Sequence, residues 1–185
     1  MLINIPNILT LSRIIMIPII IILSLYNHSA TNLLVFFIFI YCGITDYLDG
    51  YLARKKNQVT LFGKLMDPIA DKILTVSILL VLIYVGVIDG LSFVAAFLII
   101  FRELLISGLR EFLSGYNQSL PVNRLGKIKT VIQFISLGVL LLAYASNISI
   151  IYQIGTLLLW LTALITIISG VSYISRGLRI LKKFK

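Results

Sequence analysis

The chain has 185 residues, of which 59% are hydrophobic and only 12% are charged, and its formal net charge is +9. Soluble proteins usually carry about 25% charged residues, and a water-soluble fold of this composition would expose large apolar patches. The composition therefore excludes an ordinary soluble protein and favours a membrane protein. Because the basic residues flank apolar segments, the positive charge indicates membrane topology and anionic ligands, and no nucleic-acid partner is expected.

Six apolar segments follow one another along the chain, and each is long enough to cross a bilayer as a helix, which takes roughly 20 residues. They lie at about 5–26, 32–53, 65–88, 91–113, 128–146 and 150–174. Their apolar runs are continuous and do not alternate with polar residues as the strands of membrane barrels do. No repeat or linker separates them. We therefore expect an all-α membrane protein with six transmembrane helices and a single domain over residues 1–185.

The joins between these segments alternate in charge. Those at 27–31, 86–90 and 146–149 contain no Lys or Arg. The basic residues gather around the other two joins and the C-terminus: Arg54, Lys55, Lys56, Lys64, Arg110, Arg124, Lys127, Lys129, Arg176, Arg179, Lys182, Lys183 and Lys185. Because basic loops stay on the cytoplasmic side of a membrane, we expect both termini and both basic joins in the cytoplasm.

Four of the seven acidic residues lie where the second apolar segment ends and the third begins: Asp46, Asp49, Asp67 and Asp71. Spacings of i, i+3 and i, i+4 place each pair on one helix face, and a short join makes the two helices antiparallel neighbours. Four ionised carboxylates near a membrane interface need compensating charge. Oxygen ligands without His or Cys favour magnesium, calcium or manganese. Four carboxylates can hold two such ions about 3.5–4 Å apart, as in phosphoryl-transfer sites.

Other interpretations of the acidic cluster remain open. The aspartates could form interfacial ion pairs with Arg54, Lys64 and Lys72. They could also serve a small cation transporter or channel, because such proteins often carry acids within the membrane. The acids lie at one interface, however, and the opposite side offers only Asp89, which disfavours a charged path across the membrane. A non-catalytic lipid-binding protein is a third possibility.

The spacing around the aspartates follows a recognisable pattern. The chain reads Asp46-Tyr-Leu-Asp49-Gly50-Tyr-Leu-Ala53-Arg54, then eight residues to Gly63, three to Asp67 and three to Asp71. This resembles the signature of the CDP-alcohol phosphatidyltransferases, D-x2-D-G-x2-A-R-x8-G-x3-D-x3-D, at all of its fixed positions. Further stretches are similar to bacterial phosphatidylglycerophosphate synthases within this family: Asn4 to Thr10 with Arg13, Asp67 to Lys72, Arg102-Glu103, Arg110-Glu111 and Gly126 to Thr130.

The resemblance implies an enzyme that moves a substituted phosphate from a CDP-linked donor to an alcohol and releases CMP, usually as a homodimer. For the synthase subgroup the donor is CDP-diacylglycerol, the acceptor is sn-glycerol 3-phosphate and the product is phosphatidylglycerophosphate. The signature does not separate acceptors, so inositol phosphate, serine or phosphatidylglycerol stay open as alternatives. The active site is expected to face the cytoplasm at the cell membrane.

The resemblance also implies roles for individual residues. Asp46 and Asp67 would contact both of two divalent cations, magnesium or else manganese, while Asp49 would contact one ion and Asp71 the other. Asp71 would also act as the catalytic general base toward the acceptor hydroxyl. The residues implied in binding CDP-diacylglycerol are Asn7, Thr10, Gly50, Arg54, Thr60 and Gly63.

The acceptor carries its own phosphate, so the proposed reaction needs a second anion site. A charge in or beside a membrane helix is costly unless it is functional or paired. The candidates for binding the acceptor phosphate are Arg102, Arg110, Lys127 and Lys129, and Arg110 and Lys127 are favoured because they lie nearer the cytoplasmic ends of their segments. Two alternatives stay open: Arg102 could pair with Glu103 or Glu111, and Lys129 could serve topology or contact lipid headgroups.

Overall fold

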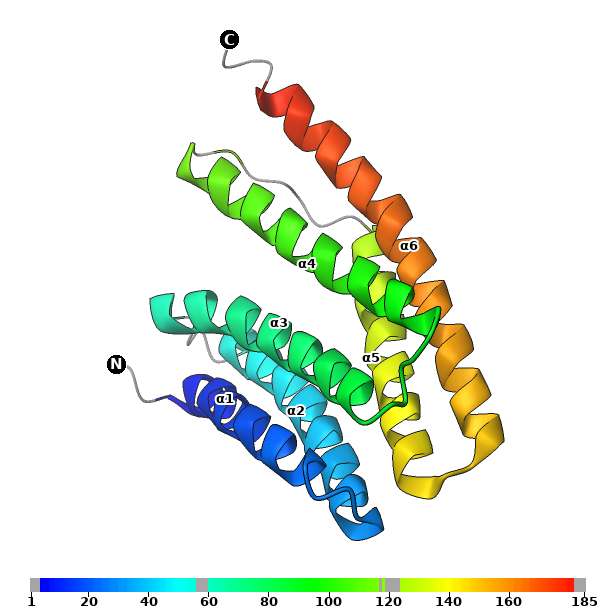
Figure 1. Cartoon of the computed structure of the whole chain (residues 1–185). Helices are drawn as coiled ribbons and strands as arrows, with labels where there is room; N and C mark the ends of the chain where they lie inside the picture. The colour runs from blue at the N-terminus through cyan, green and yellow to red at the C-terminus, as the bar shows by residue number, and fades with distance from the viewer. Residues whose placement is uncertain (1–3, 56–59, 117, 119–123, 182–185) are drawn as a thin grey trace. The chain divides into compact units, whose positions relative to one another are not determined.

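The structure is a computed structural model that describes residues 4–55, 60–116, 118 and 124–181. Over these residues all regular secondary structure is helical, which confirms the predicted class. Figure 1 shows the helices in chain order: α1 (Ile5–Ser24), α2 (Ser29–Lys55), α3 (Leu61–Tyr84), α4 (Ser92–Gly115), α5 (Arg124–Ser146) and α6 (Ser149–Leu181).

Polar caps define where α1 and α3 begin. The side-chain oxygen of Asn4 accepts a hydrogen bond from the backbone N–H of Asn7 at 2.9 Å, and Pro6 lies in the first turn, where a missing N–H costs nothing. The Thr60 hydroxyl oxygen likewise accepts from the N–H of Gly63 at 3.0 Å. Because a cap satisfies N–H groups that have no partner within the helix, both helices start beside the residues predicted to bind the donor.

Left-handed backbone conformations reverse the chain between helices. Gly86 and Gly90 have φ angles of 77° and 46° in the turn between α3 and α4. Asn27 and Asn147 have φ angles of 44° and 55° before α2 and α6. Glycine adopts this region freely, and asparagine tolerates it better than most residues. These turns lie in the three joins that lack Lys and Arg.

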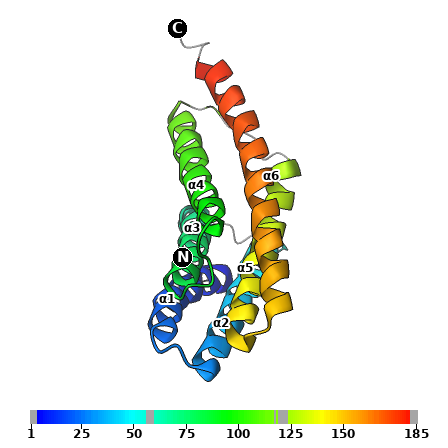
Figure 2. The same ribbon diagram turned by 45° about the vertical axis from the view of Figure 1, so that its right-hand side comes forward.

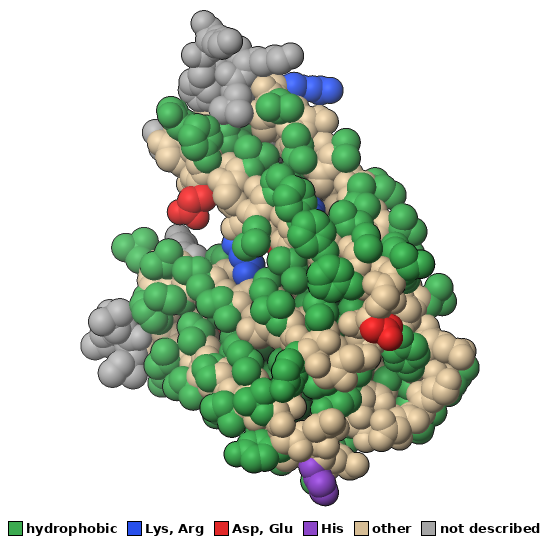
Figure 3. Space-filling model, in the orientation of Figure 1, with side chains coloured by type: hydrophobic (Ala, Val, Ile, Leu, Met, Phe, Trp, Pro, Cys, Tyr) green, Lys and Arg blue, Asp and Glu red, His purple; other side chains and the backbone are tan. Residues whose placement is uncertain are grey.

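Within the described residues, five helices are long and apolar enough to cross a membrane: α1, α2, α4, α5 and α6. The first half of α3 contains Asp67, Asp71 and Lys72, so its part without charged residues extends only from Ile73 to Tyr84. Figure 3 shows hydrophobic side chains over most of the visible face, as lipid contact requires. The chain is thus a multi-pass membrane protein. The sixth crossing remains a prediction, and Lys56, Lys182, Lys183 and Lys185 lie outside the described residues.

The chain divides into two compact units. The first combines the described residues of Met1–Val87 with Gly138–Tyr152, and the second combines Ile88–Leu137 with those of Gln153–Lys185. The first unit therefore holds α1, α2 and α3 with the end of α5 and the start of α6. The second holds α4 with the longer parts of α5 and α6.

In the first unit, α1 packs against both α2 and α3. Ile17 and Ile20 of α1 are buried in its core, as are Val35 and Phe39 of α2. Gly138 packs close to Phe39, because a Cβ atom there would lie 3.5 Å from the Phe39 ring. Because α1 contacts both neighbours, side chains of α2 and α3 can meet at α1, and this is where the acidic residues come together.

In the second unit, α4 and α6 run side by side, as the two views in Figures 1 and 2 show. Their contact is built on a small buried group of Ile106, Leu113 and Tyr173. A Cβ atom at Gly177 would come within 2.8 Å of a methyl group of Leu109. The glycine therefore allows the two helices to approach at this level, which brings polar residues of α6 to those of α4.

Candidate active site

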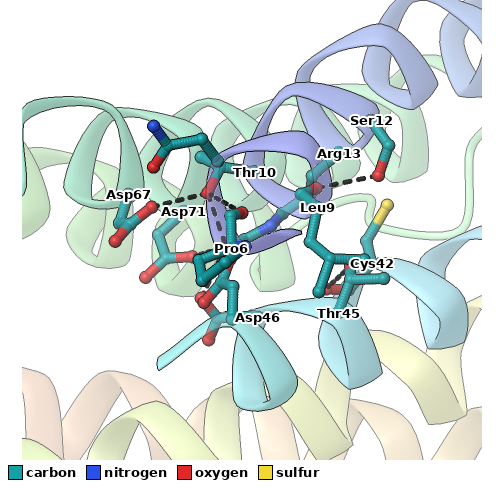
Figure 4. Close-up of polar contacts among 12 residues, drawn as sticks. Pro6, Leu9, Thr10, Ser12, Arg13, Cys42, Thr45, Asp46, Asp67 and Asp71 are labelled. Carbon is teal, nitrogen blue, oxygen red and sulfur yellow. Dashed lines mark hydrogen bonds and ion pairs between the residues drawn. The ribbon is translucent and has the colours of Figure 1, made fainter. Parts of the chain in front are cut away.

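The four predicted carboxylates lie around one side of α1. Asp46 and Asp49 come from α2, Asp67 and Asp71 come from α3, and α1 contributes Thr10 and Arg13. Figure 4 labels all of these residues except Asp49. The convergence expected from the helical spacing is therefore present. The convergence involves a third helix, because the partners of the carboxylates belong to α1.

Arg13 binds three of the carboxylates. Its Nη1 donates to Asp46 Oδ1 at 2.5 Å and to Asp71 Oδ1 at 2.6 Å. Its Nη2 donates to Asp49 Oδ2. The Arg13 side chain is 0% exposed, whereas Asp46 and Asp71 remain 46% and 51% exposed. One buried guanidinium thus links α2 to α3, while two carboxylates keep an open side for a ligand.

Thr10 holds the fourth carboxylate. Its hydroxyl lies 2.7 Å from Asp67 Oδ1, 3.1 Å from the carbonyl oxygen of Pro6 and 3.2 Å from Asp49 Oδ2. A hydroxyl has a single hydrogen to donate, and the shortest of these distances identifies Asp67 as its acceptor. α1 therefore contacts all four aspartates, three through Arg13 and one through Thr10.

Three of the residues predicted to bind the donor lie together beside Asp67. The Thr60 hydroxyl donates to Asn7 Oδ1 at 2.9 Å. A Cβ atom at Gly63 would lie 3.1 Å from Asn7 Oδ1, 3.3 Å from Thr60 Oγ1 and 3.8 Å from Asp67 Oδ2. Only a glycine fits there without displacing these side chains. The structure therefore brings Asn7, Thr60 and Gly63 together with the acidic cluster.

Gly50 and Arg54 follow the acidic pair of α2. A Cβ atom at Gly50 would lie 3.5 Å from Arg54 Nη1, so the arginine side chain runs back over the glycine. The Arg54 side chain is exposed. A guanidinium can donate two parallel hydrogen bonds to a phosphate, and among the described residues it is Arg13, not Arg54, that pairs with the aspartates.

The predicted acceptor-binding residues belong to the second unit. Arg102 Nη1 donates to Glu103 Oε1 at 3.2 Å, and Arg102 Nη2 donates to Ser169 Oγ at 3.1 Å. Lys129 also forms an ion pair with Glu103 and is only 3% exposed. The alternative in which Arg102 pairs with Glu103 is thus observed. Lys129 is buried and ion-paired, which distinguishes it from the exposed basic residues that set the topology of a membrane protein.

Tyr173 connects the two arginines of this group. Arg110 Nη2 donates to the Tyr173 hydroxyl oxygen at 3.0 Å. The guanidinium carbon of Arg110 lies 5.0 Å from the centre of the Tyr173 ring, and that of Arg102 lies 5.4 Å from it. Both are within range of cation–π attraction. Lys127 has an exposed side chain and makes none of these contacts.

The basic group has unused capacity for an anion. Arg102, Arg110 and Lys129 together carry more positive charge than Glu103 can balance. The Nε atoms of both arginines are buried and have no hydrogen-bond partner among the described residues. A buried donor without a partner is costly, and a phosphate could accept hydrogen bonds from such groups.

The oxygen chemistry of the acidic cluster fits a hard divalent cation. Carboxylates and the Thr10 hydroxyl supply oxygen atoms only, which is the ligand set that magnesium and manganese prefer. In the part of the chain that the structure describes, no three acidic, His or Cys side chains are arranged as a ready metal-binding group. Arg13 lies among the carboxylates instead. Its position shows that this site attracts and accommodates positive charge.

Three residues that the structure places in these sites have no role assigned from the sequence: Arg13, Ser169 and Tyr173. Arg13 belongs to a stretch that resembles the synthases, and a charged residue in an apolar segment is a usable sign of function. Ser169 and Tyr173 lie in the last apolar segment, where the sequence gives no sign that they meet Arg102 and Arg110. Their contribution becomes visible only when α4 and α6 are placed side by side.

Comparison with known proteins agrees with the signature. Residues 3–168 match the family model of the CDP-alcohol phosphatidyltransferases. The chain is 45% identical to the CDP-diacylglycerol–glycerol-3-phosphate 3-phosphatidyltransferase of Rickettsia typhi, with 92% of this chain and 94% of that protein aligned. The protein of the same name from Bacillus subtilis is 36% identical over 97% of each chain. For the Haemophilus influenzae protein the identity is 36%, over 92% and 91%. The chain therefore belongs to the CDP-alcohol phosphatidyltransferase family, as residues 46–71 predict.

Proposed function

We propose that this protein is a CDP-diacylglycerol–glycerol-3-phosphate 3-phosphatidyltransferase. It transfers the phosphatidyl group of CDP-diacylglycerol to sn-glycerol 3-phosphate and produces phosphatidylglycerophosphate and CMP. The observation that carries this proposal is the complete family signature, whose four aspartates contact Thr10 and Arg13 of α1. The relatives at 36–45% identity that carry this name support the choice of acceptor within the family.

In the proposed reaction, the acceptor hydroxyl oxygen forms a bond to the phosphorus that carries the diacylglycerol group. The bond from that phosphorus to the oxygen of CMP breaks, and CMP leaves. Asp71 takes the hydroxyl proton as general base. Its carboxylate is half-exposed beside the other aspartates, so it can reach a bound acceptor.

The donor binds to the first unit in this proposal. Arg54 donates hydrogen bonds to the pyrophosphate. Asn7, Thr10, Thr60 and Gly63 contact the CDP part beside Asp67, and Gly50 leaves space for the Arg54 side chain. The hydrogen bond between Thr60 and Asn7 fixes both side chains before the donor arrives.

Asp46, Asp49, Asp67 and Asp71 hold two divalent cations in this proposal, magnesium in preference to manganese. When bound, these ions neutralise the pyrophosphate and the charge that develops on the leaving CMP. The all-oxygen donor set supports this choice of metal. The protein contributes the carboxylates on rigid helices and keeps Asp67 oriented through the Thr10 hydroxyl.

The acceptor phosphate binds to Arg102, Arg110 and Lys129 in the second unit, with Lys127 as a further candidate. The positive charge of this group exceeds the charge of Glu103, and the buried Nε atoms of Arg102 and Arg110 have no hydrogen-bond partner among the described residues; both observations support this assignment. We also propose a single catalytic domain with six membrane crossings, both termini and the active site on the cytoplasmic side of a bacterial cell membrane, and a homodimeric assembly. The alternation of basic joins supports the orientation.

The direct test is CMP release by the purified protein from CDP-diacylglycerol and glycerol 3-phosphate with magnesium. We expect Asp67→Asn to lower the rate by about 100-fold or more, equivalent to roughly 3 kcal/mol of transition-state stabilisation. Asp89→Asn, in the join after α3, is the matched control and keeps the wild-type rate. Full activity of Asp67→Asn would remove the proposed metal site. Activity with inositol phosphate, serine or phosphatidylglycerol, and none with glycerol 3-phosphate, would replace the proposed acceptor.

A further inference from the structure

Arg13 is a fully buried arginine in the first apolar helix. Burying a guanidinium is strongly unfavourable unless charged partners compensate it. All the ion pairs that Arg13 makes within the described residues are with the acidic cluster, to Asp46, Asp49 and Asp71. Its Nε has no hydrogen-bond partner there. The interactions of this side chain are therefore concentrated in the two terminal nitrogens that face the carboxylates.

The oxygens that Arg13 binds belong to the proposed metal ligands. Asp46 Oδ1, Asp71 Oδ1 and Asp49 Oδ2 each accept a short hydrogen bond from the guanidinium. An oxygen engaged in this way is less available to a metal ion, and two cations held at the same carboxylates repel one another. Thr10 is different, since it holds Asp67 with a neutral hydroxyl and brings no competing charge.

We propose that Arg13 is a built-in counter-ion of the metal site. Its guanidinium holds Asp46, Asp49 and Asp71 together against their mutual repulsion, and divalent cations compete with it for the same oxygens. This inference rests on the proposed binding of metal ions by the aspartates. Arg13 then acts as a positioning residue that keeps the carboxylates in place and limits the affinity for the metal.

A purely structural role for Arg13 makes a different prediction. If Arg13 only links α1 to α2 and α3, its loss weakens the fold equally with and without metal and leaves metal affinity unchanged. If it competes with the metal, its loss destabilises mainly the metal-free protein. By linkage, the metal then binds the variant more tightly and stabilises it more.

The test compares purified wild-type protein with Arg13→Gln. Mn²⁺ binding is followed by the electron paramagnetic resonance of free Mn²⁺, and thermal unfolding is measured with and without Mn²⁺. We expect Arg13→Gln to have the lower Tm without Mn²⁺, a larger rise of Tm on adding it, and about tenfold tighter Mn²⁺ binding. Arg102→Gln is the matched control: it also removes a paired, largely buried arginine and keeps the wild-type Mn²⁺ affinity.

Arg13→Lys keeps the test decisive if Arg13→Gln does not fold. An ammonium keeps the charge and lacks the two-nitrogen fork that bridges the carboxylates, so we expect Mn²⁺ binding about threefold tighter than in the wild type. Mn²⁺ affinity equal to or weaker than wild type in the variants that fold would overturn the inference. If the wild-type protein binds no Mn²⁺, the proposed metal site fails and the inference fails with it. Wild-type Mn²⁺ binding without tighter binding by the variants removes the inference alone.

Discussion

Asn7, Thr10 and Arg13 form a polar face on α1. They are spaced three residues apart, so they lie on the same side of the helix, and all three are buried. Asn7 accepts a hydrogen bond from Thr60, the residue that caps α3, while Thr10 binds Asp67 and Arg13 binds the other three aspartates of the signature. The first helix thus completes a site whose signature residues all come from α2 and α3.

Gly63 offers a residue-level test of the donor site. In Gly63→Ala, the new methyl group would lie 3.1 Å from Asn7 Oδ1 and 3.3 Å from Thr60 Oγ1, so both side chains must shift. We expect the KM for CDP-diacylglycerol to rise roughly five-fold, equivalent to about 1 kcal/mol of binding. The KM for glycerol 3-phosphate should stay the same. Steady-state kinetics of CMP release with each substrate varied in turn measures both.

Gly108→Ala is the matched control for this change. Gly108 lies in α4, and a Cβ atom there meets nothing within 4 Å. Its KM values should therefore equal those of the wild type. An unchanged KM for CDP-diacylglycerol in Gly63→Ala would place the donor away from the group formed by Asn7, Thr60 and Gly63.

Helix α6 supplies the side chains that hold the two arginines of α4 in place. Ser169 accepts a hydrogen bond from Arg102, and a Cβ atom at Gly170 would lie 3.1 Å from the Arg102 Cγ atom. One turn further on, Tyr173 contacts both arginines. A hydroxyl, a small residue and an aromatic ring on one helix therefore fix the side chains of the helix beside it.

Tyr173→Phe tests this contribution of α6. The change removes the hydroxyl oxygen that accepts from Arg110 Nη2 and keeps the ring under both guanidinium groups. Because an intramolecular hydrogen bond contributes about 1 kcal/mol, we expect a roughly five-fold higher KM for glycerol 3-phosphate. The KM for CDP-diacylglycerol should not change. Tyr152→Phe, earlier on the same helix, should match the wild type in both constants. A rise in the KM for the donor alone would contradict the assignment of this group to the acceptor.

The helices could be predicted from the sequence because continuous apolar runs of this length have few other solutions in a membrane. Their ends were harder to predict. The third segment, expected at 65–88, forms a helix at Leu61–Tyr84, because the Thr60 cap starts it earlier and the turn at Gly86 follows its end. Caps and left-handed turns depend on single residues, which a pattern of hydrophobicity does not resolve.

Across the whole molecule, the aspartates of the site could be predicted from the sequence, and the side chains that contact them from distant helices could not. The signature placed four carboxylates, because their helical spacing alone makes each pair share a face. The contacts of Arg13 and Tyr173 depend on how helices distant in the sequence pack. For Arg13 the unusual charge is visible beforehand and its partners are not. For Tyr173 neither is visible, because a tyrosine in an apolar helix has many ordinary roles.

The orientation of α3 decides the topology of the whole chain. Its 24 residues span about 36 Å at 1.5 Å per residue, which exceeds a hydrocarbon core of about 30 Å. Its first half carries charged residues, however, so length alone does not establish a crossing. If α3 crosses, Lys55 before it and Asp89 after it lie on opposite sides of the membrane. If it does not, they lie on the same side.

Single cysteines at these two positions distinguish the cases. The only natural cysteine, Cys42, is buried and is removed in a Cys42→Ala background. In intact bacterial cells, a membrane-impermeant maleimide should label Asp89→Cys, and it should label Lys55→Cys only after the membrane is permeabilised. His28→Cys, in the join before α2, is the control that should be labelled from outside. CMP release by each variant checks that it is folded. Because α3 carries Asp67 and Asp71 near its start, labelling of Lys55→Cys from the inside places these carboxylates at the cytoplasmic surface. Labelling of both Lys55→Cys and Asp89→Cys from one side of the membrane would contradict the sixth crossing and reduce the chain to five.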